Sequence, residues 1–356
     1  MDSADIRRWA AELGFALAGV ARAVSVPETA WYQRWVEAGF AGEMKYLTDH
    51  RAAIRSDPRR LLPSAQTIVC LGILYNTPAP LTLQDGAYRG WISRYAWGDD
   101  YHDLIRARLS QLAERMRAAY GDFDYRVCVD TAPLLERSYA RLAGLGWIGK
   151  NTCLINQGQG SWFLLGEILT SLEIQPDTPP PDRCGTCQRC VYSCPTQAIV
   201  PRGDGYWTID SRRCISYLTI ELRNEIPPAR RPAMGTHLFG CDICQDVCPW
   251  NRRAPDSAEP AFAPREGLLG PDLEEMARLT PQEFRVRFGG TPVERARYRG
   301  FLRNVAIAMG NARQEKFRPL LVPMAQSEDA VVAEAAHWAL AQLDAVRYLD
   351  QEETNG

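Results

Sequence analysis

The sequence lacks the features that mark membrane proteins, secreted proteins and proteins with a general affinity for nucleic acid. No stretch of its 356 residues approaches the ~20 consecutive apolar residues that a membrane-spanning helix needs. The opening run, MDSADIRRWAAELGFALAGVA, alternates charged and apolar residues at helical spacing and has no cleavage-site pattern. The formal net charge is only -2, so any attraction to nucleic acid must be local. We therefore expect a cytoplasmic protein without membrane contact.

Cysteine, by contrast, is abundant and unevenly placed. Of the 11 cysteines, eight lie in or near two short runs, CGTCQRCVYSCP and CDICQDVCP, with the spacing of metal ligands. This clustering favours a reducing compartment over a disulfide framework. Cys70, Cys128 and Cys153 lie outside the runs in apolar contexts, and we expect them to be small buried hydrophobic residues.

Three regions follow one another along the chain. Residues 1–178 have a mixed α/β pattern, with a strand predicted in AQTIVCLGILYN and a helix at 100–121. YRVCVD predicts a further strand that turns through TAP into a helix, with Asp130 at the strand end, where side chains often face a ligand crevice. Proline-rich QPDTPPPD precedes the cysteine-rich module, assigned to 179–260, and residues 261–356 predict a HEAT-like domain of amphipathic helices.

The first cysteine run fits C-x2-C-x2-C-x3-C-P, the pattern that binds a [4Fe-4S] cluster in bacterial ferredoxins. In two-cluster proteins of this type the fourth cysteine binds the other cluster, so a second set of ligands is expected. The second run is one cysteine short, and the cysteine in RRCISYL can complete it. We predict one site with Cys184, Cys187, Cys190 and Cys248, and another with Cys194, Cys214, Cys241 and Cys244. Two four-cysteine zinc sites are the alternative, although such sites usually pair two C-x2-C knuckles.

Several stretches resemble the epoxyqueuosine reductases, cobalamin- and iron-sulfur-dependent enzymes of tRNA modification. They span about residues 60–251 and include SRYAWGDDYH, AGLGWIGKNT, CISYLTIEL and FGCDICQDVCPWN. The resemblance implies a cobalamin-binding α/β catalytic domain that reduces the epoxide of epoxyqueuosine, at the wobble position of tRNA anticodons, to the alkene of queuosine. It also implies that electrons pass through two clusters to a base-off cobalamin. We expect a monomer served by a low-potential donor such as a flavodoxin or ferredoxin.

The implied reaction consumes two electrons and two protons and releases water, so it needs a general acid. The resemblance implies that Asp130 of VDTAP is this acid, kept protonated by apolar surroundings; an N-cap of the following helix is the alternative role. His102 is not expected to bind cobalt, because DYHDLI has Ile105 where the D-x-H-x-x-G signature has glycine. The candidate cofactor or substrate contacts are Arg55, Arg94, Tyr95, Asp130, Gly149, Lys150, Asn151 and Ser216.

The segment 285–318 carries nine basic residues and two acidic ones, which makes a local basic patch in a chain of nearly balanced charge. A solvated helix face is one interpretation, and contact with RNA phosphates is the other. With the family resemblance we favour tRNA contact, which would position the anticodon stem without reading its sequence. The candidate residues are Arg285, Arg287, Arg295, Arg297, Arg299 and Arg303.

Two other functions fit parts of the sequence. A cobalamin-dependent reductive dehalogenase combines the same cofactors, but such enzymes typically carry an export signal, which we do not expect here. A ferredoxin-like electron-transfer subunit would explain the cysteines, but it would leave residues 1–178 without a purpose.

Overall fold

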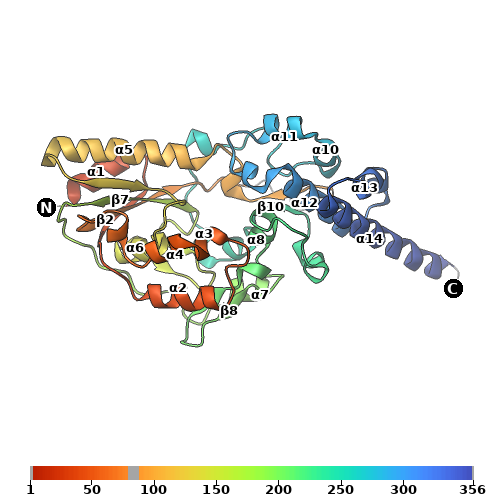
Figure 1. Ribbon diagram of the computed structural model, residues 1–356, viewed down its shortest axis with the longest axis horizontal. Coiled ribbons are helices and arrows are strands. Elements are labelled where there is room, and N and C mark those ends of the chain that lie inside the picture. Colours follow the sequence, from red (N-terminus) through yellow and green to blue (C-terminus); the bar gives the residue numbers. More distant parts are fainter. Residues whose placement is uncertain (1–2, 79–87, 355–356) are drawn as a thin grey trace.

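The computed structural model describes residues 3–78 and 88–354. One antiparallel sheet supports the N-terminal half, with its strands in the order β1, β2, β7, β4 (Figure 1). These strands are β1 (Leu17–Arg22), β2 (Thr67–Leu74), β7 (Phe163–Thr170) and β4 (Tyr125–Cys128). The strands predicted in AQTIVCLGILYN and YRVCVD are therefore confirmed. Because the sheet is antiparallel, its loops do not collect at one edge as they do in a parallel sheet.

Helices cover both faces of this sheet. One face packs against α1 (Ala4–Glu12) and α5 (Tyr101–Tyr120), and the other packs against α6 (Glu136–Leu142). Strand side chains alternate between the two layers: Leu71 belongs to the core under α5, whereas Cys70 belongs to the core under α6. Gly166 of β7 admits α5, because a Cβ there would lie 2.6 Å from Ile105 Cγ2. The connection from β1 to β2 contains α2 (Glu28–Glu37), α3 (Lys45–Thr48) and α4 (His50–Ile54).

The cysteine-rich segment is built from short elements. These are α7 (Arg189–Ser193), the hairpin β8 (Ile199–Pro201) and β9 (Trp207–Ile209), α8 (Ile215–Ile220), β10 (His237–Phe239) and α9 (Ile243–Asp246). The segment is joined to the first region, because β10 pairs in parallel with β3 (Trp91–Ile92). The hairpin β5 (Trp147–Ile148) and β6 (Leu154–Ile155) packs against Cys248.

Short 3-10 helices connect many of these elements. They are η1 (Pro58–Arg60), η3 (Arg94–Ala96), η4 (Ser211–Arg213), η5 (Pro228–Arg230), η6 (Pro232–Met234), η7 (Pro249–Asn251), η8 (Pro260–Phe262), η9 (Pro292–Ala296) and η10 (Glu315–Phe317).

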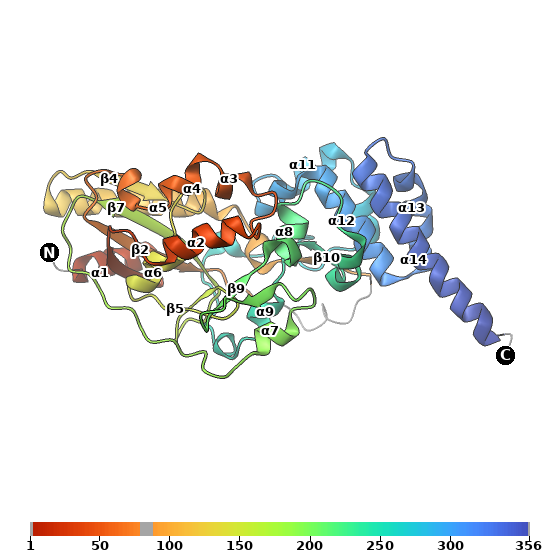
Figure 2. The same ribbon diagram turned by 60° about the horizontal axis from the view of Figure 1, so that its bottom comes forward.

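The last part of the chain is helical, as predicted, and Figure 2 shows it at the opposite end of the molecule from α1. It contains α10 (Leu273–Arg278), α11 (Pro281–Phe288), α12 (Arg297–Ala312), α13 (Arg318–Ala325) and α14 (Ala330–Thr354). Gly310 lets α12 and α14 approach closely, since a Cβ there would lie 2.8 Å from the Ala339 Cα. In the part of the chain that the structure describes, no helix combines the length and the apolar character needed to cross a membrane.

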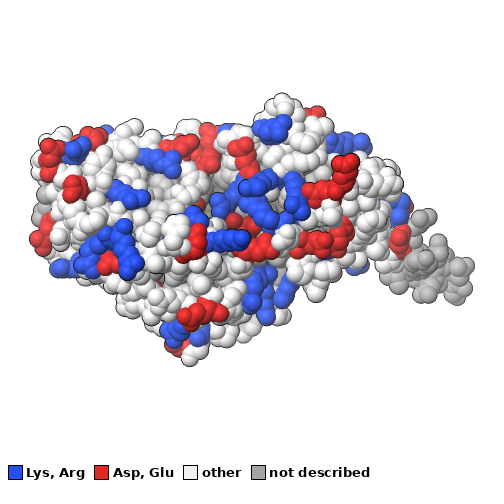
Figure 3. Space-filling model, in the orientation of Figure 1, with Lys and Arg blue, Asp and Glu red and all other residues white. Residues whose placement is uncertain are grey.

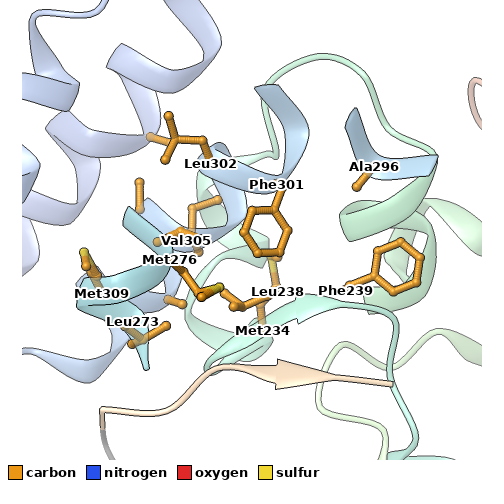
Figure 4. Close-up of a cluster of buried hydrophobic side chains, with 14 of the residues drawn as sticks. Met234, Leu238, Phe239, Leu273, Met276, Ala296, Phe301, Leu302, Val305 and Met309 are labelled. Carbon is orange, nitrogen blue, oxygen red and sulfur yellow. The ribbon is translucent and has the colours of Figure 1, made fainter. Parts of the chain in front are cut away.

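One core joins these helices to the cysteine-rich segment. Figure 4 shows Phe301 and Val305 of α12 close to Leu238 of β10, with Met276 of α10 beside them. Burying a side chain of this size contributes about 1.5–3 kcal/mol, so this contact region holds α12 firmly in place. The 3-10 helix η9 and the start of α12 are thereby fixed in position relative to the cysteine-rich segment.

Candidate active site

The cysteines of each predicted set come together in the folded chain. Those of the first set, Cys184, Cys187, Cys190 and Cys248, line one cavity of about 250 Å³. In the second set, burial and the nearby thiols of Cys214 and Cys194 raise the pKa of Cys241, and Cys244 lies next to Cys214 and Cys241. Across residues 3–78 and 88–354, no three His, Cys, Asp or Glu side chains are gathered tightly enough to hold a single metal ion.

Hydrogen-bond donors surround the sulfur atoms of the second set. The Ala198 backbone NH donates to Cys194 Sγ at 3.3 Å. The Ser216 hydroxyl and backbone NH donate to the Cys214 sulfur, which lowers its pKa against the larger, raising effect of burial. In iron-sulfur proteins, donors of this kind help to set the cluster potential. Ser216, predicted as a cofactor or substrate contact, is therefore placed at a candidate cluster ligand.

The predicted turn at Gly149, Lys150 and Asn151 is hydrogen-bonded to a loop of each cysteine set. Lys150 Nζ donates to the carbonyl oxygens of Gly185 and Cys187 at 2.7 and 2.8 Å. The buried Asn151 side chain donates to the Cys244 carbonyl at 3.3 Å. One turn of the α/β region thus holds a loop of each cysteine set, and any contact of this turn with a corrin remains a prediction.

The three cysteines outside the runs behave differently from one another. Cys70 and Cys128 are buried, as predicted. The prediction for Cys153 was wrong: this side chain is only partly buried and shares a hydrogen bond with Cys244. The apolar neighbours of Cys153 in the sequence gave no indication of this contact, because the two cysteines are brought together only by folding.

The remaining predicted contacts lie in two places, with Arg94 and Tyr95 near the second cysteine set and Arg55 in a separate cavity. Arg94 Nη1 donates to Asn76 Oδ1 at 3.0 Å, and its Nη2 pairs with Asp246 at 2.9 Å, so it ties the end of β2 to α9. Tyr95 packs against Phe239 beside the second cysteine set. Arg55 is buried, donates to the Tyr46 carbonyl at 2.8 Å and lines a separate cavity of about 280 Å³.

Asp130 lies in the loop after β4 and contacts His102, the second residue of α5. His102 Nε2 is 3.2 Å from Asp130 Oδ2, and its Nδ1 is 2.6 Å from Asp100 Oδ1. Burial lowers the pKa of His102, but hydrogen bonds to Asp100 and Asp130 outweigh this effect and raise the pKa to about 9. Near neutral pH the ring is therefore an imidazolium held between two carboxyl groups.

The structure does not support two expectations for Asp130, namely an apolar environment and a role as helix N-cap. Its side chain keeps 51% of its exposure, so apolar surroundings do not enclose it. It also does not cap the following helix, because α6 begins at Glu136 with Leu135 as its N-cap. The backbone of Asp130 has a positive φ of 44°. Its NH donates to the Glu136 carboxylate instead, which fixes the loop to the start of α6.

Two further acids lie behind this loop, and sequence reasoning missed both. Glu167 of β7 is fully buried between Cys70 and Cys128 on the neighbouring strands, and neither of its carboxyl oxygens has a hydrogen-bond partner. Burial, together with the charges of Glu136 and Asp130, raises the pKa of Glu167 well above its usual range. Burial and the nearby Asp130 also raise the pKa of Glu136. The one available sign in the sequence was that Glu167 is a charged residue within the otherwise apolar strand FLLGEILT.

Aromatic and charged side chains from distant segments border Asp130. Burial and then the charge of Glu221 raise the pKa of Tyr46 to about 12, and Asp130 and Arg295 also act on this phenol. Arg295 of η9 is ion-paired with Glu221. Tyr101 of α5 stacks on the His102 ring at 4.2 Å between centroids. The site therefore has a charged rim from three regions of the chain.

The predicted basic patch divides into different environments. Arg295 and Arg297 lie near Arg223, whose pKa is lowered first by burial and then by their charges. Arg299 is exposed and pairs with Asp329. Figure 3 shows Lys and Arg side chains gathered at the middle of this face, between the places of α3 and α12 in Figure 1.

Two predicted members of the patch lie on α11, apart from the others. Arg287 is ion-paired with Glu275, and Arg285 donates to Gln282 at 2.9 Å. The prediction for Arg303 was wrong. This side chain is 1% exposed, and its guanidinium donates to the carbonyls of Leu218, Leu222 and Asn224. Arg303 is a structural link between α12 and the end of α8, because the helix face that carries it points into the core.

Comparisons with known proteins agree with this arrangement. The family model described as epoxyqueuosine reductase QueG, DUF1730, matches residues 55–131, and the 4Fe-4S double cluster binding domain matches residues 183–251. The second match supports two [4Fe-4S] clusters in place of zinc.

Relatives match over nearly the whole chain. The chain is 43% identical to the epoxyqueuosine reductase of Xanthomonas campestris pv. campestris, over 96% of each sequence. Its fold matches the epoxyqueuosine reductase of Streptococcus thermophilus with a TM-score of 0.86 and 31% identity, over 95% of this chain and 89% of the other. It also matches an epoxyqueuosine reductase bound to a tRNA-Tyr epoxyqueuosine-modified stem loop, with a TM-score of 0.85, 27% identity and the same coverage. The chain therefore belongs to the epoxyqueuosine reductase family, a family of oxidoreductases.

Proposed function

We propose that this protein reduces the epoxide of epoxyqueuosine in tRNA to the alkene of queuosine. Family membership supports the reaction, and the observation that carries it in this chain is the His102 imidazolium bound to Asp130 beside two sets of cysteines. Each epoxide must take up two electrons and two protons and release water. The His102–Asp130 pair can supply a proton, and the cysteine sets would hold the clusters that supply electrons.

The resident cofactors would be two [4Fe-4S] clusters and a base-off cobalamin. The first cluster would take Cys184, Cys187, Cys190 and Cys248, and the second would take Cys194, Cys214, Cys241 and Cys244. When bound, the clusters supply low-potential electrons and cobalamin supplies a strongly reducing cobalt centre. No protein histidine is proposed as a cobalt ligand, since His102 is already bound at both ring nitrogens.

The chain offers polar groups that fit a corrin with its amide side chains. The cavity that contains Arg55 has a volume of about 280 Å³ and lies between α2, the start of α6 and β9. On its wall Glu28 Oε2, Glu136 Oε1 and Arg202 Nε are buried without hydrogen-bond partners. Buried polar atoms of this kind favour a ligand that can pair with them. We propose that this cavity holds part of the cobalamin and that Arg94, Tyr95 and the turn at 149–151 support the adjoining part.

Asp130 is the proposed proton donor to the substrate oxygen. Its partial exposure leaves the carboxyl group accessible to a bound nucleoside, and the His102 imidazolium holds a proton within hydrogen-bond distance of it. The Asp100 carboxyl group stabilises the imidazolium and holds the ring in position. Arg295, which is ion-paired with Glu221 and lies near Asp130, is proposed to contact the nucleoside or its phosphate.

The tRNA is proposed to lie across the start of α12. Arg295, Arg297 and Arg299 lie there, with Arg295 and Arg299 ion-paired to carboxylates, and Arg295 also lies near Asp130. We assign the division of the chain accordingly, with residues 1–178 as the α/β catalytic domain, 179–260 as the cluster module and 261–356 as a HEAT-like domain that contacts tRNA. Phosphate contacts from these arginines would position the anticodon stem.

An anaerobic reconstitution tests the proposal. Protein supplied with iron, sulfide and cobalamin receives a chemical reductant and tRNA that carries epoxyqueuosine, and the digested tRNA is analysed by mass spectrometry. Queuosine should form only when cobalamin is present. The variant Asp130→Asn should keep both cofactors but lose turnover by about 100-fold or more, whereas Asp103→Asn, a change at an exposed carboxylate of α5 next to His102, should have little effect. If epoxyqueuosine persists when the wild-type protein carries both clusters and cobalamin, epoxyqueuosine in tRNA is not the substrate.

A further inference from the structure

Exposed arginines without partners surround the first cysteine set. Arg183, Arg189 and Arg252 are exposed, and none of these three side chains has a hydrogen bond or ion pair anywhere in the described chain. Arg94 and Arg295, by contrast, are ion-paired. Tyr192 on α7 is 81% exposed among these arginines, although it is a large aromatic residue.

These residues form one continuous surface. Arg183 and Arg189 line the cavity of the first cysteine set. Arg189 also lines a neighbouring groove of about 420 Å³ together with Tyr192 and Arg252. We call Arg183, Arg189, Tyr192 and Arg252 the first-cluster face.

Nearby carboxylates do not neutralise the first-cluster face. Asp246 lines the same groove, but it is ion-paired with Arg94. Asp182 is exposed, and one of its oxygens accepts the backbone NH of Cys184 at 2.7 Å. The face therefore keeps a net positive charge.

The second cysteine set is the one nearer to the proposed acid. In the second set, Cys214 and Cys241 pack against the same core as Tyr95. The charge of Asp130 acts on Tyr95, so the second set is the one near the proposed acid. Electrons from outside the protein would therefore enter most directly at the first set, under the first-cluster face.

We propose that the first-cluster face docks an acidic one-electron carrier protein. The proposal rests on the proposed function and adds the site and the charge of the electron donor. At each encounter the carrier is oxidised by one electron and the first cluster is reduced by one, so two encounters serve each epoxide. The two protons and the oxygen that leaves as water belong to the tRNA reaction and do not pass through this face. Tyr192 supplies an aromatic contact of the kind enriched in protein interfaces.

A tRNA contact is the competing use of a positive surface. The proposed tRNA residues lie at the start of α12, whereas α7 and α9 lie together at the lower edge of the molecule in Figure 2. The first-cluster face also adjoins the first cysteine set, whereas the second set is the one linked through Tyr95 to Asp130. Both observations favour an electron carrier for this face.

The experiment measures cluster reduction and tRNA turnover separately. Reduced flavodoxin, an acidic carrier, is mixed anaerobically with the reconstituted holoenzyme, and cluster bleaching is followed by stopped-flow absorbance at several salt concentrations. Turnover of epoxyqueuosine-containing tRNA is then measured with titanium(III) citrate as a small reductant. The variants are Arg252→Glu and Tyr192→Ala, and the matched control is Arg60→Glu, an exposed arginine at the end of η1.

Arg252→Glu should slow bleaching by flavodoxin at low salt on the order of five- to tenfold, and high salt should remove most of the difference. Tyr192→Ala should slow it at all salt concentrations, and Arg60→Glu should match the wild type. Turnover with titanium(III) citrate should be unchanged in every variant. Equal bleaching rates in all proteins would overturn the proposal, as would a raised KM for tRNA in Arg252→Glu with titanium(III) citrate. Loss of wild-type tRNA turnover with unaltered bleaching would count against the proposed function alone.

Discussion

Changing Asp100 to asparagine should move the alkaline limit of catalysis. The protonated His102 ring lies between Asp100 and Asp130, and its side chain is 23% exposed. The difference between its ordinary pKa of 6.5 and about 9 corresponds to about 3 kcal/mol in favour of the imidazolium. Two carboxyl groups share this effect, so removing the charge of Asp100 should lower the pKa of His102 by about one pH unit.

The assay is the pH dependence of queuosine formation with a chemical reductant in excess. The wild-type rate should fall as pH rises through about 9, because His102 then loses the proton that it shares with Asp130. In Asp100→Asn the same fall should begin about one pH unit lower, while Asp103→Asn should keep the wild-type profile. An equal loss of rate at every pH in Asp100→Asn would refute the reasoning and leave Asp100 with a structural role only.

The stability of the protein provides a second measurement of the same effect. A histidine whose pKa is raised by folding stabilises the protein fully below its ordinary value of 6.5, and this contribution is lost as pH rises through about 9. Asp100→Asn should therefore lower the free energy of unfolding at pH 6 by about 1 to 1.5 kcal/mol and have almost no electrostatic effect at pH 10. Thermal unfolding of the holoenzyme at the two pH values measures this difference.

Three further predictions address the remaining parts of the site. Arg303→Met should lower the unfolding free energy by about 3 kcal/mol or more, measured by denaturant unfolding, because it leaves buried carbonyls unpaired; normal stability with weakened tRNA binding would contradict this. Because folding raises the pKa of Glu167, wild-type stability should fall as pH rises above the ordinary glutamate value, and Glu167→Gln should flatten this dependence in melting curves at pH 5 to 9. Cys184→Ser and Cys248→Ser should leave the same surviving cluster spectrum by electron paramagnetic resonance, and Cys241→Ser should leave the other; different spectra for the first two would refute the proposed pairing.

Local spacing in the sequence was sufficient for the elements whose partners lie within a few residues of one another. The period of apolar residues predicted α5 and the helices from α12 onward, and the β-branched apolar run around Cys70 predicted β2. The cysteine spacing, combined with the crossover rule, predicted which cysteines line the first cavity, including Cys248. The motif VDTAP identified Asp130 only through its resemblance to a known family.

The tertiary structure decided which charged groups act on one another. His102 and Asp130 are 28 residues apart, and no local pattern relates the end of β4 to the start of α5. Arg303 occupies a basic stretch, yet its helix face is turned into the core, where it satisfies three backbone carbonyls. Glu167 looks like an ordinary polar residue of a strand, but it lies on the α6 side of the sheet, between Cys70 and Cys128, and is completely buried there. Burial and through-space charge depend on the whole packed chain, so the protonation states at this site are set by the fold and not by any local sequence pattern.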